Sequence, residues 1–151
     1  MTDHDDNPPP PGMTAREALD AAHGALAELA GKLGIEFLEF GQRSVRARMP
    51  VEGNTQAYGI LHGGATASLC ETVASIGTAF LVGIDKLVMG IDLSVTHVRS
   101  ARSGWVTVTA TPLRVGRTIA HWDMRVHDDD GRLVAVSRLT LAVREPAARP
   151  S

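Results

Sequence analysis

The chain has 151 residues, of which 44% are hydrophobic, so it is long enough for one domain with a hydrophobic core and too short for two. Its formal net charge of −2 is spread over mixed signs without a long run of lysine and arginine, which argues against nucleic acid as a partner. The single cysteine, Cys70, cannot form an internal disulfide, and no secretion-signal pattern opens the chain, so we expect a cytoplasmic protein.

The two ends of the chain differ from its middle in composition. Residues 1–12 are acidic and rich in proline, and residues 145–151 are similarly poor in apolar side chains. Such segments bury too little apolar surface to offset the entropy of ordering, so we expect both to be disordered. A single domain is therefore expected over residues 13–144.

The first predicted element is an amphipathic helix that begins at Thr14 and ends near Gly31 or Gly34. Thr14 lies three residues before Glu17, which is the spacing of a capping box. Apolar residues then recur at helical spacing, namely Leu19, Ala22, Leu26 and Leu29.

A hairpin and a long helix are predicted next. Segments 35–40 and 44–51 are strand-like and lie on either side of Gly41, which favours a hairpin. The segment 63–82 is predicted to be a helix about 30 Å long. Its only charged side chain is Glu71, and a central carboxylate opposes membrane insertion by about 2.5–3.5 kcal/mol. We therefore expect the core helix of a soluble domain and no membrane partner.

Four further strands are predicted from alternating apolar and polar residues. They cover residues 87–95, 106–111, 120–127 and 132–143. The turns between them are too short to hold crossover helices, so the strands are expected to pair antiparallel as a meander. The predicted fold is α+β, with a six-stranded antiparallel sheet wrapped around one long central helix. Its exposed edge or face is expected to bind a second subunit.

Glu71 lies on a helix face of small polar residues, without the lysine, arginine and glutamine that are typical of a solvated face. That face holds Gly64, Ser68, Ser75 and Thr78, whereas the apolar stripe holds Leu69, Val73, Ile76 and Phe80. A carboxylate on such a face can lie in a crevice, where partial desolvation strengthens it as a base or nucleophile. We therefore interpret Glu71 as a candidate catalytic group.

The turn before the helix, formed by His62, Gly63 and Gly64, suits an oxyanion site. The two glycines let a ligand approach the backbone, and the first amides of a helix have no partners within it. These amides and the helix dipole favour a carbonyl oxygen that develops negative charge. The same turn can also serve only to begin the helix, so its weight comes from its combination with Glu71.

The segment YGILHGGATASLCETVAS, residues 58–75, resembles the signature of hotdog-fold acyl-CoA thioesterases. The likeness includes the His-Gly-Gly turn and an acidic residue nine positions after the histidine, and the order of elements is similar over residues 33–144. Within this superfamily the chain resembles the PaaI-type and 4-hydroxybenzoyl-CoA thioesterase branches, including the 1,4-dihydroxy-2-naphthoyl-CoA hydrolases and enterobactin-pathway proofreading thioesterases. Further likenesses are HVRSAR at 97–102 and GRLVAVSRLT at 131–140.

The resemblance implies catalytic roles for five residues. Glu71 would be the nucleophile or the base that activates water, and the Gly63 amide would polarise the thioester carbonyl. Gln56 would orient water or the thioester, His62 would lie beside the leaving sulfur, and Ser75 would support the carboxylate or the water. In the family, the groups at the first two positions come from opposite subunits of a dimer. That implies an inactive monomer and a homodimer, with a homotetramer as the expected assembly.

The resemblance also implies a site for the coenzyme A part of the substrate, and no separate cofactor. The candidate residues are Gly64, His97, Arg99, Ser100, Arg102, Arg117, Thr118 and Arg138. The arginines and hydroxyls are suitable donors to phosphates, although ordinary solvated strand ends have the same composition. His97 would either face the acyl pocket or be a hydrogen-bonded structural histidine.

Other chemistries are disfavoured. Cys70 points about 100° away from Glu71 around the helix and has no evident activating base, so we interpret it as a small buried residue. The histidines lack metal-ligand spacing and no Gly-x-Ser-x-Gly elbow occurs, so neither a metal site nor a serine hydrolase is expected. Two alternatives to a thioesterase stay open: a hotdog enoyl-thioester hydratase or dehydratase, and a non-catalytic acyl-CoA-binding module. The acyl group, aromatic or medium-chain aliphatic, is also open.

Overall fold

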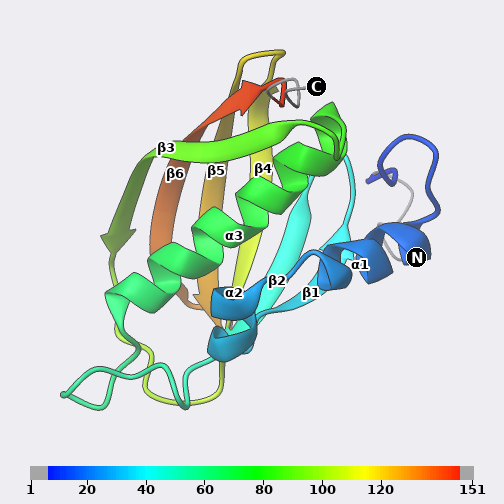
Figure 1. Ribbon diagram of the computed structural model, residues 1–151. Helices are drawn as coiled ribbons and strands as arrows, with labels where there is room; N and C mark the ends of the chain where they lie inside the picture. The colour runs from blue at the N-terminus through cyan, green and yellow to red at the C-terminus, as the bar shows by residue number, and fades with distance from the viewer. Residues whose placement is uncertain (1–6, 147–151) are drawn as a thin grey trace.

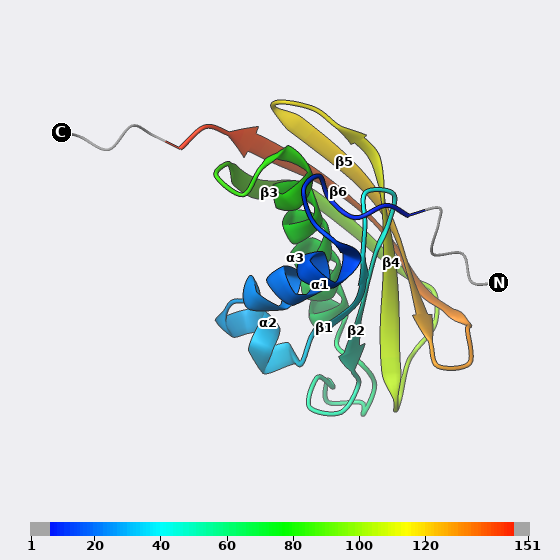
Figure 2. The same ribbon diagram turned by 90° about the vertical axis from the view of Figure 1, so that its right-hand side faces the viewer.

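The computed structural model describes residues 7–146, which form one sheet with helices on one face (Figure 1). In chain order the elements are α1 (Ala15–Gly24), α2 (Glu28–Leu33), β1 (Glu36–Phe40), β2 (Val45–Pro50), α3 (Gly63–Val82), β3 (Leu87–His97), β4 (Trp105–Val115), β5 (Ile119–Asp128) and β6 (Leu133–Arg144). The strands form one antiparallel sheet in the order β1-β2-β4-β5-β6-β3. Figure 2 shows all three helices on the same side of the sheet. The predicted α+β class, long helix and hairpin are confirmed, while the expectations for residues 1–6 and 147–151 fall outside the described residues.

The N-terminal helix predicted over residues 14–34 is in fact two helices. Thr14 caps α1 as expected, because its hydroxyl accepts from the Glu17 amide at 3.2 Å and the Glu17 carboxylate accepts from the Thr14 amide at 2.8 Å. The helix ends at Gly24, whose helix propensity is poor, and the chain turns before α2 begins. Leu29, which was expected in the apolar stripe, is 59% exposed as a result.

Residues 7–12, which were expected to be disordered, are bound to the turn between β1 and β2. The Asn7 side-chain amide donates to the Ser44 carbonyl oxygen at 3.0 Å, and the Asn7 side-chain oxygen accepts from the Ser44 amide at 3.1 Å. The Gln42 amide donates to the Pro8 carbonyl oxygen at 2.7 Å. Backbone polar groups of the turn hold this segment, and composition alone does not reveal such partners.

The four C-terminal strands do not form a simple meander. β4, β5 and β6 pair in succession, but β3 crosses to the far edge and pairs with β6, from Leu87 opposite Arg144 to His97 opposite Ala135. The place beside β4 is taken by β2. The connecting segment 98–104 carries the chain between these positions without a helix. Among the described residues, β3 therefore has no strand on its outer side.

The edge strand β3 changes face at a β-bulge between Gly90 and Asp92. The apolar side chains before and at the bulge are the β3 edge patch: Leu87, Met89 and the bulged Ile91, which are 48%, 49% and 59% exposed. Those after it, Leu93 and Val95, pack partly against the core. An extra residue in one strand shifts the alternation by one, so the uniform pattern predicted over 87–95 is wrong for the first half of the strand. The bulge leaves apolar surface on an open edge.

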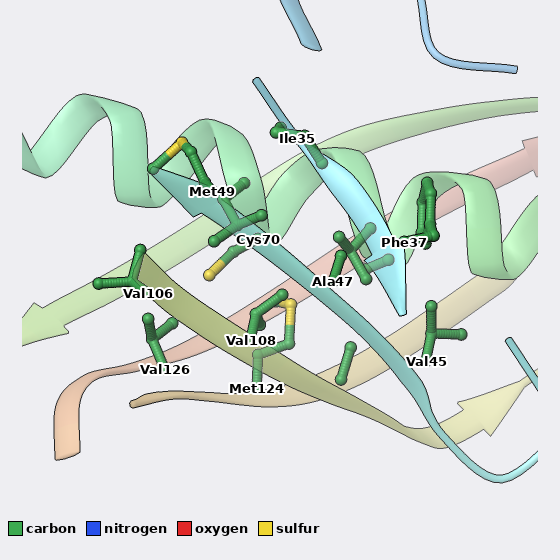
Figure 3. Packing of buried hydrophobic residues seen from close by; sticks show 14 of the residues in the cluster. Ile35, Phe37, Val45, Ala47, Met49, Cys70, Val106, Val108, Met124 and Val126 are labelled. Carbon is green, nitrogen blue, oxygen red and sulfur yellow. The ribbon is translucent and has the colours of Figure 1, made fainter. Parts of the chain in front are cut away.

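The core lies between α3 and the sheet. Figure 1 shows α3 running diagonally across the strands, and Figure 3 shows apolar side chains of β2, β4 and β5 packed together beneath it. A Cβ built on Gly77 would lie 2.8 Å from Cη2 of the fully buried Trp122. Only a glycine lets the helix come this close to the ring.

A buried hydrogen bond fixes the contact between α3 and β5. The Trp122 indole Nε1 donates to the Thr78 hydroxyl at 2.8 Å, and that hydroxyl donates to the Ala74 carbonyl oxygen at 2.8 Å. Thr78 is fully buried, so its predicted place on the open face with Glu71 is wrong. Trp122 reaches this side of the helix and covers it.

We expect Thr78→Val to lower the free energy of unfolding by about 1–3 kcal/mol, because it keeps the side-chain volume but leaves the buried Trp122 N–H without an acceptor. Urea unfolding measures the loss. Thr72→Val, the same change at a half-buried position of α3, is the control and is expected to cost much less. Equal losses for the two variants would contradict the role of the indole bond.

Candidate functional site

His62 caps the N-terminus of α3 and accepts hydrogen bonds from most of the backbone amides in the first turn of the helix. Its Nδ1 accepts from the Gly64 amide at 2.8 Å, and its carbonyl oxygen accepts from the Ala65 amide at 3.0 Å and the Thr66 amide at 3.2 Å. Of the first amides of the helix, which were expected to face a ligand, those of Gly64, Ala65 and Thr66 therefore already have acceptors. Within residues 7–146, the Gly63 amide is the first-turn N–H that has no acceptor.

The loop before α3 is held by bonds to two other parts of the fold and by a turn of its own. The buried Asn54 side chain donates to the Leu33 carbonyl oxygen at the end of α2, at 2.8 Å. The Leu61 amide donates to the Ala101 carbonyl oxygen at 2.8 Å, and the Gln56 amide closes a turn within the loop. These bonds fix the position of Gln56 relative to the start of α3.

The first candidate site is the Gly63 pocket, a hollow of about 390 Å³ at the N-terminus of α3. Five of the predicted site residues line it: Gln56, Gly63, His97, Arg99 and Ser100. A Cβ built on Gly63 would lie 3.0 Å from Cε1 of His97, so the glycine allows the imidazole to pack against the backbone. The pocket thus offers one free amide, one amide side chain and a cation.

The second candidate site is the Glu71 groove, a hollow of about 410 Å³ between α3 and α2. Its polar residues are Ser68, Glu71, Thr72 and Ser75, so the predicted pairing of Glu71 with Ser75 is present. Glu71 is exposed, and a Cβ built on Gly90 of β3 would lie 2.5 Å from its Oε1. No ion pair in the described part of the chain holds the carboxylate.

The two sites are separate within one protomer. Gly63 and Glu71 are eight residues apart on one helix, which is about 12 Å along its axis. Glu71 does not line the Gly63 pocket, and neither Gly63 nor Gln56 lines the Glu71 groove. A single thioester group cannot reach both Glu71 and the Gly63 amide in an isolated protomer.

The candidate coenzyme A residues fall into three places. Arg102 lies next to the Gly63 pocket, in a hollow shared with acidic residues of the β5–β6 turn. Arg117 and Thr118 lie with Gly116 at the opposite end of the sheet, beside the C-terminal end of α3. Arg138 is exposed on β6 and its Nε donates to Asp123 at 3.2 Å. One protomer therefore does not gather these donors at one phosphate.

Two basic side chains beside Arg117 were not identified from the sequence. Arg114 and His121 line the same hollow of about 400 Å³ around Gly116. Arg114 lies in β4, three residues before Arg117, and His121 lies in β5, three residues after Thr118. The concentration of basic residues around this turn is the sequence signal that could have identified both side chains.

Cys70 is not a reactive thiol. It is fully buried on the sheet side of α3, where Figure 3 shows it pointing toward apolar side chains. Burial raises the pKa of the Cys70 thiol to about 12. The interpretation of Cys70 as a small core residue is confirmed, and the described residues contain no cluster of His, Cys, Asp and Glu that could hold a metal.

We expect Cys70 to react with a disulfide reagent at pH 8 only as fast as the protein unfolds, because the buried thiol stays protonated there and is inaccessible. Stopped-flow absorbance follows the reaction, with denatured protein as the control. Because the pKa is raised on folding, the free energy of unfolding should also fall as the pH rises above the ordinary thiol value of 9.0. Fast labelling of the native protein would contradict the burial.

Comparison with known proteins agrees with the fold. Residues 58–135 match the family described as the thioesterase superfamily. The 1,4-dihydroxy-2-naphthoyl-CoA hydrolase of Escherichia coli is 37% identical over 128 residues, 84% of this chain and 93% of its own. A proofreading thioesterase of Cronobacter turicensis is 37% identical over 128 residues, 84% of this chain and 92% of its own. The crystal structure of a Haemophilus influenzae thioesterase superposes with a TM-score of 0.81 at 35% identity, covering 88% of this chain and 94% of that one. The chain therefore belongs to the thioesterase superfamily and has the hotdog fold that its sequence resembled.

Proposed function

We propose that the protein is a cytoplasmic acyl-CoA thioesterase that hydrolyses an aromatic or medium-chain acyl-CoA to the free acid and coenzyme A. The observation that carries the proposal is the pairing on α3 of one free amide, at Gly63, with one exposed carboxylate, at Glu71. An amide of this kind stabilises an oxygen that gains negative charge. A carboxylate without an ion pair is free to act on water or on carbon.

The chemistry divides between these two groups. The thioester carbonyl oxygen accepts from the Gly63 amide, and Glu71 either takes a proton from an attacking water or attacks the carbonyl carbon to form an anhydride that water then hydrolyses. In both routes the carbon–sulfur bond breaks and the sulfur leaves with a proton. Direct attack leaves the water oxygen in the released acid, whereas hydrolysis of the anhydride leaves it in the released acid or in the Glu71 carboxylate, according to which carbonyl carbon the water attacks. Gln56 in the Gly63 pocket and Ser75 in the Glu71 groove orient the water and the carboxylate.

In its neutral form, His62 has the ring tautomer that suits a position beside the leaving sulfur. Its Nδ1 accepts the Gly64 amide, so in the neutral ring the proton is on Nε2. His62 is exposed, and Nε2–H is free to donate to the sulfur as it gains charge. Gly64 itself serves the ligand by its lack of a side chain, since its amide is taken.

A second copy of the chain would bring the two sites together. Glu71 lies against Gly90 and Gly63 lies against His97, and both contacts are on the edge strand β3. If two β3 edges pair antiparallel so that Gly90 faces the partner's His97, each Glu71 approaches the partner's Gly63. The β3 edge patch would be buried by this pairing, which removes its exposure to water.

The same pairing supports the coenzyme A assignment. Antiparallel edges bring the Arg117 end of one protomer to the same side as the Arg99 and Arg102 end of its partner. Phosphate donors that one protomer keeps apart would then serve one substrate. Arg138 is the weakest of the assigned contacts because Asp123 already binds it, and a homotetramer would form from two such dimers.

The alternatives fit the sites less well. A hydratase or dehydratase of this fold would use a histidine together with a carboxylate, but its usual spacing differs from the nine residues that separate His62 from Glu71. A module that only binds acyl-CoA gains little from an unpaired carboxylate beside a thioester, because such a group acts mainly on the transition state.

We expect Glu71→Ala to lower kcat/KM for acyl-CoA hydrolysis by at least about a hundredfold while coenzyme A binding and the unfolding temperature change little. Free-thiol release measures turnover across aryl- and alkyl-acyl-CoAs. Asp20→Ala, which removes another exposed helical carboxylate, is the control and should retain activity. Full turnover in the Glu71 variant would sink the mechanism.

We expect Ile91→Asp to give a folded monomer without thioesterase activity, because it places a charge in the proposed contact between two β3 edges. Light scattering after size exclusion gives the mass, and free-thiol release gives the turnover. Leu113→Asp, at a residue 58% exposed on β4, is the matched control and should keep both the assembly and the activity. A fully active monomer would rule out the shared site.

A further inference from the structure

We infer, on the basis of the proposed thioesterase function, that the connector between α1 and α2, together with the first turn of α2, is the wall of the acyl site and selects uncharged apolar acyl groups. The apolar residues of the Glu71 groove are Ala25, Ala27, Leu29, Ala30 and Ile76. Four of the five come from the N-terminal helical segment, and Ile76 faces them from α3. A thioester attacked by Glu71 therefore has its acyl group within reach of this wall.

The composition of the wall favours a ligand over solvent. Connectors between helices are normally polar, and the residue before a helix is best as serine, threonine, aspartate or asparagine. Here Ala27 caps α2 with no side-chain hydrogen bond, which makes the start of this helix less stable than those residues would. Ala25, Ala27 and Leu29 are all exposed. An apolar surface kept at this cost beside a catalytic carboxylate fits a substrate contact.

The wall is held firmly enough to discriminate by shape. The C-terminal end of α2 is fixed where the Asn54 side chain donates to the Leu33 carbonyl oxygen at 2.8 Å. The end of α1 is fixed where the Phe37 amide donates to His23 Nε2 at 3.0 Å. Ala30, at the centre of α2, is buried. A groove between rigid elements rejects groups that are too long or too wide.

Charge decides which acyl groups the groove accepts. Glu71 is the one formally charged side chain among the residues that line it. Among the described residues of one protomer, no cation lines this groove, and the arginine of the partner's Gly63 pocket is assigned to the coenzyme A phosphates. Glu71 would therefore repel an acyl chain that ends in a carboxylate. The small side chains of the alanines leave the space that a medium-length alkyl or single-ring aryl group fills. The class selected is thus neutral and apolar.

Two variants that change the groove in opposite directions test this. Ala27→Phe narrows it, and Leu29→Ala widens it. Ala15→Phe, the same enlargement at an exposed position of α1 outside the groove, is the control. For each protein, kcat/KM is measured by free-thiol release with acetyl-, hexanoyl-, decanoyl-, benzoyl- and succinyl-CoA, and thermal unfolding confirms that each one folds.

We expect the wild type to use hexanoyl- or benzoyl-CoA at least about tenfold better than succinyl-CoA. Ala27→Phe should lower kcat/KM for decanoyl- and benzoyl-CoA about tenfold or more while acetyl-CoA changes less than about twofold. Leu29→Ala should shift the preference toward the longer chain, and Ala15→Phe should match the wild type.

Two results would overturn the inference, and they are distinguishable. If the wild type is active but Ala27→Phe and Leu29→Ala alter all substrates equally or not at all, the connector is not the acyl wall and the thioesterase function stands. If the wild type releases thiol from none of the substrates, the proposed function fails and the acyl wall fails with it.

Discussion

The arrangement of both sites depends on how closely α3 lies on the sheet. Glycines allow the closest contacts, because a Cβ on Gly77 would lie 2.8 Å from the Trp122 ring and one on Gly63 would lie 3.0 Å from the His97 ring. A similar approach at Gly90 brings β3 against the Glu71 carboxylate. The helix is therefore a rigid element that fixes the position of the Gly63 amide at its N-terminus and of the Glu71 carboxylate near its middle. Loosening any of these contacts would move a reacting group relative to the edge strand.

Composition would also allow this helix to cross a membrane, since α3 is long and apolar enough to do so. In the structure, its apolar side chains pack on the sheet and it is the core helix of the fold. The face that stays open carries Glu71 and small residues. The apolar composition that makes α3 resemble a membrane span is therefore what this helix needs to pack against the rest of the fold. Its remaining face is left for chemistry.

Local signals were enough to predict most of the elements. The capping box at Thr14, the hairpin around Gly41 and the helix over 63–82 all follow from neighbouring residues, and the structure has each of them. The strand pairing could not be predicted in the same way, because β3 and β6 are distant in sequence and the bulge at Gly90 hides the true alternation. The break after Gly24 was missed since both helices continue the same apolar pattern.

The candidate site, like the fold, could be predicted from local sequence signals only in part. Helical spacing identified Glu71 and Ser75 as neighbours, and the glycine turn identified the Gly63 amide, but spacing could not show that His62 would take the Gly64 amide. Nor could it show that α2 supplies a wall of the Glu71 groove, because that contact joins segments about forty residues apart. Distances across the fold, rather than residue types, were the missing information.

The central claim is that Glu71 of one protomer and Gly63 of the other act on one thioester. It is tested most directly by mixing two inactive variants, Glu71→Ala and Gly63→Pro. The second removes the amide donor at the first position of α3, where proline suits the helix. The exposed His97 ring, 3.0 Å from a Cβ at this position, must shift slightly to accept it. Each variant alone should release no thiol above background. After joint refolding, half of the dimers are mixed and one of their two sites is intact, so about a quarter of wild-type turnover should return. No recovery from well-folded mixed dimers would show that both groups act within one protomer and would contradict the account.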